Sequence, residues 1–252
     1  MQASHIVSLH GIHHSFTPTK PVFNELNLEI NKGEYLTILG PGGSGKSTLL
    51  KVILGIIKPQ SGSVNVLGKP IDSLKENERS SLFKKMGMAF QQGALFDFMT
   101  VKENILFAME NMTDFNKKER EDRVKTFLDQ VLLGHAADKI PSELSGGMRR
   151  RVGFIRALVT NPELALLDEP TAGLDPVTTT IVIDMIHKIG TDIGTTMVSV
   201  TSNIDVAFRF ALNVAILKDG KIIGKGTKEQ LLALNDPWIT NFLTIRKNAY
   251  EI

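Results

Sequence analysis

Hydrophobic residues along this chain follow two spacings, one typical of strands and one typical of helices. Apolar runs rich in β-branched residues at 35–39 and 195–201 each predict a buried strand. Apolar residues three and four positions apart at 148–159 predict an amphipathic helix. The two patterns alternate over much of the chain, and this alternation is typical of an α/β fold.

The beginning of the chain differs from its middle. Residues 6–38 indicate short strands, and a turn signal at 58–62 leads into a further strand at 63–67. From about residue 93 to residue 160 the pattern is helical. No repeat, linker or low-complexity segment interrupts the sequence. We therefore expect one domain over residues 1–252, with a helical subdomain at about 93–160.

One predicted helix inside that segment has a charged side and an apolar side. The charged residues at 117–122 are typical of a solvated face. The apolar residues, which we expect to be buried, are Val124, Phe127, Leu128, Val131 and Leu132.

Composition and charge exclude several classes of protein. The 29 basic and 27 acidic side chains leave a net charge of +2, which is no electrostatic footprint for nucleic acid. The absence of cysteine excludes a disulfide framework and a cysteine-ligated metal, and the six histidines have no zinc spacing. No signal peptide pattern and no apolar run near eighteen residues is found. We therefore expect any work at a membrane to be done through bound partners.

A glycine-rich loop between the strand at 35–39 and a helix pattern at 47–54 carries the strongest chemical signal. Its spacing, G-x-x-x-x-G-K-S, is that of a nucleotide phosphate-binding loop in the strand, loop and helix context that the motif requires. A glycine-rich turn without a ligand is disfavoured, because the match spans eight positions in that context. The loop residues predicted to bind the nucleotide are Gly40, Pro41, Gly42, Gly43, Ser44, Gly45, Lys46, Ser47 and Thr48.

Two side chains of this loop have predicted roles toward ATP and Mg²⁺. Lys46 should reach the β- and γ-phosphates, and Ser47 should provide a hydroxyl to Mg²⁺. Backbone N–H groups and the helix N-terminus should hold the phosphates. A phosphate loop alone does not separate kinases, GTPases and transport ATPases, so a second motif must decide.

That second motif is L-S-G-G-M at residues 144–148, where the predicted helix 148–159 begins. Ser145 could be an ordinary N-cap residue, but this explanation does not account for the paired glycines. A glycine-lined helix N-terminus is an anion site, and one ATP already fills the first site. We therefore expect Ser145, Gly146 and Gly147 to hold the γ-phosphate that another copy of the chain presents.

At this point the chain resembles the ATP-binding subunits of ABC transporters, whose signature is LSGGQ; Met148 stands at the glutamine position. The resemblance implies an ABC-type P-loop NTPase domain with an antiparallel β subdomain and a helical subdomain. The segment 163–170 reads E-L-A-L-L-D-E-P, a buried strand that ends in two carboxylates, as in a Walker B motif. Asp168 is expected to hold Mg²⁺ through water, and Glu169 is the candidate general base.

Three further residues take their roles from the resemblance. Asp175 closes a segment that matches the family's D-loop, which crosses the dimer interface and contributes to the nucleotide site. Gln91 should complete the Mg²⁺ shell and sense the membrane subunit, although Gln92 is an adjacent alternative. Phe16 lies where the family has an aromatic residue that stacks on adenine, whereas a lone phenylalanine in a strand is also typical of simple core.

One position departs from the family pattern. The family histidine that contacts the γ-phosphate falls on Ser202 in this chain. A serine hydroxyl has a shorter reach than imidazole and cannot become cationic near neutral pH. We therefore expect normal nucleotide binding and slow hydrolysis. The candidate catalytic residues are Lys46, Gln91, Glu169 and Ser202, and the candidate metal ligands are Ser47, Gln91 and Asp168.

The wording F-Q-Q-G-A-L-F at 90–96, with P-S-E-L-S-G-G-M at 141–148, closely resembles the ATPase subunit of Mla-type phospholipid transporters. That resemblance implies an ATPase homodimer at the cytoplasmic face of the inner membrane. It also implies a multispanning permease, an MCE-domain lipid-binding protein and a STAS-domain protein as partners.

Alternative classes remain at this point. An ABC transporter for another substrate would share the nucleotide motifs. A soluble ABC protein of translation or DNA repair usually carries two cassettes or a long coiled-coil insert, and neither is present in this sequence. A phosphotransferase with a phosphate loop would lack the signature helix and would need an acceptor site.

Overall fold

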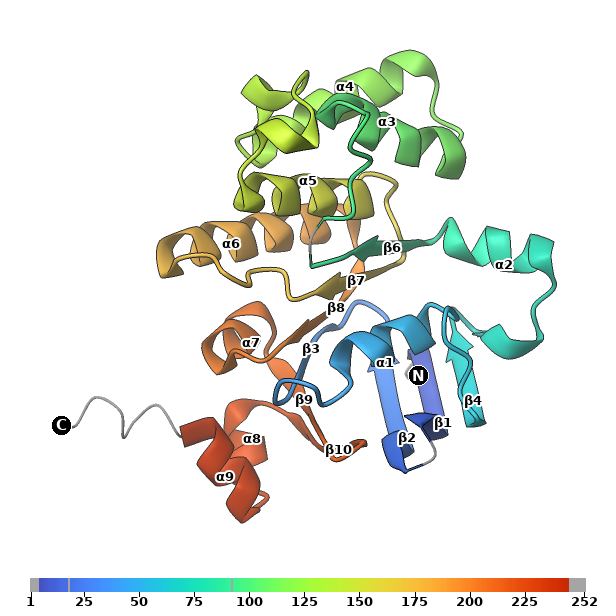
Figure 1. The fold of residues 1–252 in the computed structure, drawn as a ribbon, viewed down its shortest axis with the longest axis vertical. Helices are drawn as coiled ribbons and strands as arrows, with labels where there is room; N and C mark the ends of the chain where they lie inside the picture. Colours follow the sequence, from blue (N-terminus) through green and yellow to red (C-terminus); the bar gives the residue numbers. More distant parts are fainter. Residues whose placement is uncertain (1–4, 18, 92, 245–252) are drawn as a thin grey trace.

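The computed structural model describes residues 5–17, 19–91 and 93–244, which form two β-sheets with helices around and between them (Figure 1). The smaller sheet is antiparallel and has the strand order β2-β1-β4-β5. The larger sheet has the order β10-β9-β3-β8-β7-β6 and is parallel except for the β10–β9 pair. The fold is therefore α/β with a separate antiparallel sheet, as the sequence predicts.

The strands occur in both halves of the chain. Their bounds are β1 His5–Thr17, β2 Lys20–Asn31, β3 Tyr35–Leu39, β4 Ser61–Val66, β5 Lys69–Pro70, β6 Met86–Ala89, β7 Leu164–Asp168, β8 Thr196–Thr201, β9 Asn213–Lys218 and β10 Lys221–Gly226.

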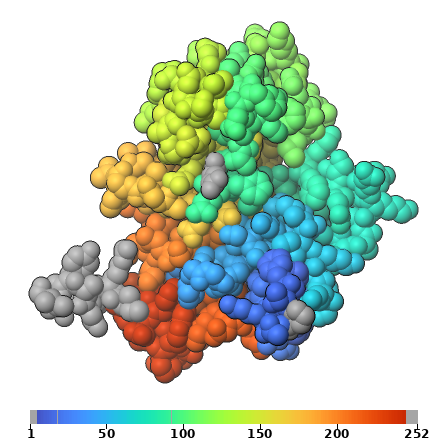
Figure 2. All heavy atoms as spheres, in the orientation of Figure 1, coloured from blue at the N-terminus to red at the C-terminus, as the bar shows by residue number. Residues whose placement is uncertain are grey.

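Two groups of helices lie at opposite ends of the molecule (Figure 1). Helices α3, α4 and α5 form one end of the molecule, while α8 and α9 lie at the other end. Figure 2 shows the first group, in green and yellow, projecting beyond the body that contains the sheets. The bounds are α1 Lys46–Ile53, α2 Glu76–Phe83, α3 Val101–Met112, α4 Lys117–Gln130, α5 Gly146–Leu158, α6 Pro176–Ile193, α7 Ile204–Phe210, α8 Lys228–Leu232 and α9 Pro237–Thr244, with short 3-10 helices at Ile71–Ser73, Gly134–Ala136 and Pro141–Glu143.

Helix α1 lies in the hydrophobic core between the two sheets. Its Leu49, Leu50 and Ile53 are fully buried, in one cluster with Ile12 of the smaller sheet and Ile38 of the larger sheet. The phosphate loop immediately before α1 is thus attached to the most deeply buried helix of this core.

Strand β7 separates that core from a second one. Leu164 and Leu166 face the core that contains α1, whereas Ala165 and Leu167 face the core formed with α3 to α6. Side chains alternate between the two faces of a strand, so β7 is apolar throughout when both faces are covered. This is why its sequence shows no polar alternation.

The structure corrects several expectations about local structure. Residues 6–38 form two long strands and β3 rather than a series of short strands, because register shifts let β1 continue past its irregular positions. Leu132 is not buried but 65% exposed, because α4 ends at Gln130 and the backbone of Leu132 is left-handed. Helix α2 has no counterpart in the sequence prediction, since Leu82 is its only buried residue.

Other expectations are confirmed. Strand β8 and helix α5 occur where the hydrophobic spacing predicts them. The remaining residues of the predicted apolar face of α4, from Val124 to Val131, are buried. None of the helices in the described ranges has the length and apolar character needed to span a bilayer.

Candidate active site

The predicted site residues gather where four parallel strands end. The phosphate loop follows β3, Gln91 follows β6, Asp168 is the last residue of β7, and Ser202 follows β8. Because β3, β8, β7 and β6 are neighbours in that order and run in parallel, their carboxyl ends share one edge of the sheet. In open α/β sheets, this edge is where ligands bind.

The phosphate loop holds its lysine tightly. The Lys46 Nζ donates to the carbonyl oxygens of Gly40 and Pro41, both at 2.9 Å, and the side chain is only 7% exposed. Burial lowers the pKa of Lys46, while the nearby carboxylates of Glu169 and Asp168 oppose this shift. The ammonium group is therefore fixed inside the loop, and phosphate oxygens can take the place of the carbonyls as its acceptors.

Two glycines of this loop are required by its shape. A Cβ at Gly40 would lie 2.4 Å from the carbonyl oxygen of Leu217, closer than atoms can approach. Gly45 precedes α1 with a φ of 99°, a conformation that favours glycine. The loop can therefore curl tightly enough for its N–H groups to surround an anion.

Two oxygen-bearing side chains meet beside the loop. The Ser47 hydroxyl, from α1, donates to Oδ1 of Asp168, from β7, at 2.9 Å. In the described ranges no cluster of three or more His, Asp or Glu side chains could hold a metal on its own. A hydroxyl and one carboxylate fit Mg²⁺ that arrives with a nucleotide, because Mg²⁺ in such sites keeps water and phosphate oxygens as its other ligands.

The side chain of Gln91 is not brought into this pair. Gln91 is exposed, and its carbonyl oxygen accepts a hydrogen bond from Nε of Arg150 at 3.0 Å. Gln92 lies outside the described residues, so the choice between the two glutamines stays a prediction.

Glu169 is held by the end of β8. Its Oε2 accepts from Oγ1 of Thr201 at 3.0 Å, and its Oε1 accepts from the backbone N–H and the hydroxyl of Ser202 at 3.0 and 3.3 Å. The backbone of Glu169 is left-handed, with φ at 47°, which turns its side chain toward β8. No sequence pattern links these residues, because they are 33 positions apart and meet only when β7 pairs with β8.

The signature segment forms an accessible helix N-terminus. Ser145 is the N-cap of α5 and accepts from the Met148 N–H at 3.2 Å, while Ser145 and Gly146 are both exposed. A Cβ at Gly147 would lie 3.3 Å from the side chain of Leu174, so the segment 172–175 packs against this end of the helix. Free N–H groups at such an end can bind an anion.

Asp175 is the N-cap of α6. Its carboxylate accepts from the N–H groups of Val177 and Thr178, both at 3.0 Å. Hydrogen bonds, the strongest from the Thr178 hydroxyl, hold the pKa of Asp175 below its usual value. Asp175 therefore fixes the start of α6 within its own subunit.

Phe16 borders a cavity of about 400 Å³ that reaches the phosphate loop. Its ring is 66% exposed, so the alternative interpretation as a core residue is wrong. The ring lies edge-on to His14 at 4.9 Å between centroids. Gly42 and Ser44 line the same cavity, and Phe16 thus offers an aromatic ring next to the loop.

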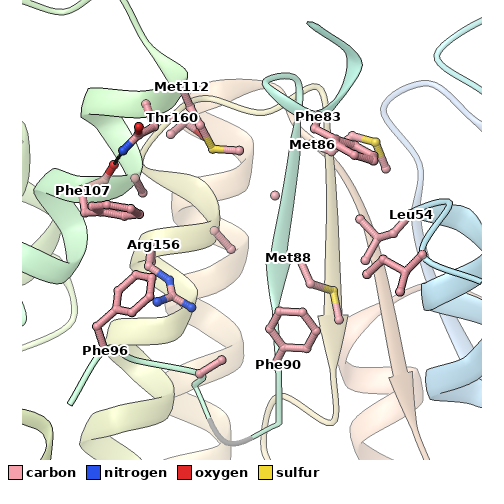
Figure 3. Close-up of a pocket in the computed structure, with 16 residues that line it drawn as sticks. Leu54, Phe83, Met86, Met88, Phe90, Phe96, Phe107, Met112, Arg156 and Thr160 are labelled. Carbon is pink, nitrogen blue, oxygen red and sulfur yellow. Dashed lines mark hydrogen bonds between the residues drawn. The ribbon is translucent and has the colours of Figure 1, made fainter. Parts of the chain in front are cut away.

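A second hollow, of about 500 Å³, is apolar and lies beyond β6 (Figure 3). Met88 and Phe90 line one side of it, and Phe96 and Phe107 line the other. We call it the β6 groove. Arg156 lies beside the Phe96 ring, at 5.8 Å from its centroid, and donates to the carbonyl oxygen of Gly93.

This fold, with a phosphate loop, a strand ending in Asp168 and Glu169, and a glycine-lined signature helix, defines an ATP-binding cassette. A family model described as ABC transporter matches residues 23–172, and the chain belongs to that family. Its domain is therefore an ABC-type ATPase.

Relatives and solved structures agree with this assignment. The chain is 36% identical to the intermembrane phospholipid transport ATP-binding protein MlaF of Haemophilus influenzae, with 88% of this chain and 84% of that protein covered. It is 39% identical to the methionine import ATP-binding protein MetN of Bifidobacterium longum, with 81% of this chain but only 50% of that protein covered, so it spans about half the length of that relative.

A dimeric, post-hydrolysis ATP-binding cassette bound to ADP and Pi is similar to the structure with a TM-score of 0.79. The two proteins are 32% identical over 88% of this chain and 98% of that chain.

Proposed function

We propose that this chain is the ATPase subunit of an ABC transporter that moves phospholipid between membranes, acting at the cytoplasmic face of the inner membrane. The observation that carries this proposal is the match to MlaF, which covers most of both proteins. The match to MetN is slightly more identical but covers half of that protein, and it favours transport of another substrate as the second candidate.

Two copies of the chain would bind two molecules of ATP between them. Ser145 and Gly146 present an exposed helix N-terminus, and the phosphate loop holds the buried Lys46 behind the exposed Gly42 and Gly43. In a head-to-tail pair, the signature segment of one copy would face the phosphate loop of the other. Glu169 would then polarise the attacking water, and Mg²⁺ would be held by Ser47 and Asp168.

The β6 groove is the proposed docking site for a short helix of the permease. Its lining is mostly apolar and includes Phe96, which is 36% exposed; the ring of Phe98, 5.9 Å from that of Phe96, is 80% exposed. An apolar groove of this kind accepts the apolar face of a helix. Because Gln91 lies two residues after the end of β6, a helix bound in the groove would shift the loop that leads to the nucleotide site. The remaining proposed partners, an MCE-domain protein and a STAS-domain protein, rest on the likeness to MlaF.

Copurification from membranes tests the partners. The wild-type chain should bring down a multispanning permease, and replacing Phe96, which lines the groove, together with its neighbour Leu95 by serine should release it while ATP affinity is retained. Leu132→Ser is the matched control, because Leu132 is an exposed leucine outside the groove. Retention of the permease by the double variant at full transport activity would contradict the groove assignment.

Reconstitution tests the substrate. The complex that copurifies should transfer labelled phospholipid between vesicles in the presence of Mg-ATP, and the Glu169→Gln complex should not. If the complex hydrolyses ATP without moving phospholipid and is stimulated by an amino acid instead, the second candidate function is correct.

A further inference from the structure

We propose that Arg150 is a positioning residue that ties the loop after β6 to the segment 172–175 within one subunit. The inference rests on the proposed roles of Gln91 and of that segment in the nucleotide site. It starts from the position of one guanidinium group, which donates a hydrogen bond to one loop and lies close to a second loop far away in the sequence.

The first contact is with the loop after β6. The Nε of Arg150 donates to the carbonyl oxygen of Gln91 at 3.0 Å. A backbone carbonyl is present whatever the side chain, so this bond fixes the course of the loop itself rather than the side chain of Gln91.

The same loop is held on α5 at further points. Arg156 Nη2 donates to the carbonyl oxygen of Gly93 at 3.1 Å. A Cβ at Gly93 would lie 2.8 Å from the carbonyl oxygen of Arg149, and a Cβ at Gly153 would lie 2.9 Å from Cα of Gly93. Backbone approaches this close leave no room for the loop to slide along α5, so the two should move together.

The guanidinium of Arg150 also lies close to Gly173. A Cβ at Gly173 would lie 3.7 Å from Nη1 and 3.9 Å from Nη2 of Arg150, so the end of the guanidinium occupies the space beside this glycine. The backbone of Gly173 is left-handed, with φ at 71°, which a larger residue would adopt only with strain. One side chain thus spans the Gln91 and Gly173 loops.

The guanidinium retains donors for further bonds. Arginine has five N–H donors, and of the three guanidinium nitrogens of Arg150 only Nε has a hydrogen-bond partner among the described residues. No ion pair involves Arg150 in the same ranges. The two terminal nitrogens lie near Gly173, in the segment before α6, where a small shift would let them bind backbone carbonyl groups.

This linkage gives Arg150 a defined part in the reaction. A displacement of the β6 groove moves the loop after β6, and Arg150 passes the displacement to the residues between Glu169 and Asp175. Because Arg150 lines neither the cavity beside Phe16 nor the phosphate loop, its loss should lower turnover rather than nucleotide affinity.

Arg150→Gln, Arg150→Lys and the control Arg151→Gln test the inference. Arg151 lies on the same helix and donates to a backbone carbonyl, that of Val131, which belongs to neither loop. Arg150→Gln should lower kcat for ATP by about 10- to 100-fold with KM changed less than about twofold, since a misplacement of about 1 Å can cost 10²-fold. Arg150→Lys should keep a rate between those of the wild type and Arg150→Gln, because a lysine ammonium lacks the planar set of N–H donors of a guanidinium.

Amide hydrogen exchange on the full-length chain without nucleotide provides a second readout. Arg150→Gln should speed exchange both at 88–95 and at 170–175, and Arg151→Gln should speed neither. Faster exchange in only one of the two segments, or wild-type kcat in Arg150→Gln, would overturn the inference. A wild-type chain that neither binds nor hydrolyses ATP would instead refute the proposed function, and the exchange result would still decide the linkage.

Discussion

Ser202 binds one carboxylate oxygen of Glu169 twice, through its backbone N–H at 3.0 Å and through its hydroxyl at 3.3 Å. The other oxygen accepts from Thr201. The residue at the family's histidine position therefore contacts the proposed base within its own subunit. The short side chain has a definite partner, even though it cannot reach as far as an imidazole.

Replacing Thr201 with valine should slow hydrolysis. Thr201 is 2% exposed, and its oxygen accepts the Asn203 N–H at 3.1 Å, so its own proton is directed at Glu169. Loss of a hydrogen bond to a charged group costs about 1.5–3 kcal/mol, which corresponds to a roughly 10- to 100-fold fall in kcat. Steady-state phosphate release measures it, and Thr201→Ser should keep the wild-type rate. If the valine variant is as fast as wild type, the hydrogen bond from Thr201 to Glu169 does not contribute to hydrolysis.

Ser202→His should raise turnover with little change in nucleotide affinity. A preorganised donor to the γ-phosphate contributes roughly 10²- to 10³-fold in rate, and the histidine would restore such a donor. Phosphate release should be compared on the same reconstituted complex. Ser202→Ala is the control, because it keeps the backbone bond to Glu169 and removes only the hydroxyl. An equal or lower rate for the histidine variant would mean that serine at position 202 is not what slows hydrolysis.

Glu169→Gln should trap a dimer with ATP bound. The amide keeps the size of the side chain but cannot take a proton from water, so binding continues while hydrolysis stops. Light scattering with saturating Mg-ATP should show the dimer, best with the permease present. Glu163→Gln is the control, because Glu163 immediately precedes β7 at the end away from the site and forms an exposed ion pair with Lys85. This variant should behave as wild type. A monomeric or fully active Glu169→Gln protein would exclude Glu169 as the base.

Lys46→Ala should weaken Mg-ATP binding by roughly 10²-fold, because about 1.5–3 kcal/mol is lost for each bond from a charged donor and about 1.4 kcal/mol corresponds to tenfold in Kd. Titration with a fluorescent ATP analogue measures the affinity. Lys51→Ala changes an exposed lysine of the same helix and should leave the affinity intact. Unchanged affinity in Lys46→Ala would rule out the phosphate-loop assignment.

Asn104→Ala should destabilise the fold. Asn104 is fully buried, and its amide donates to the carbonyl oxygens of Phe96, Met99 and Thr100 while its Oδ1 accepts the Phe96 N–H. Leaving such buried groups unpaired should lower the free energy of unfolding by about 1–3 kcal/mol. Urea denaturation measures this change. Asn111→Ala, at an exposed asparagine of the same helix, should cost less than about 0.5 kcal/mol, and equal losses would contradict the role of Asn104.

The sequence predicts those parts of the site whose residues are neighbours along the chain. The phosphate loop and the signature helix are each one continuous segment, and their local geometry follows from glycine positions and hydrophobic spacing. The bond between Ser202 and Glu169 could not be predicted in this way, because it depends on which strands pair. The predicted burial of Leu132 is wrong for a related reason, since the periodicity of apolar residues does not show that α4 ends at Gln130.

Strand β7 has hydrophobic cores on both sides, and packing on both faces fixes the position of Asp168 in the sheet. A slip by one residue would exchange the small Ala165 with the larger Leu164 and Leu166 in both cores at once, and neither could absorb the change. Substitutions confined to the outer helices or to the β6 groove should therefore leave the register of β7 unchanged. The Asp168 carboxylate, which is proposed to hold the metal, would keep its position relative to the neighbouring strands.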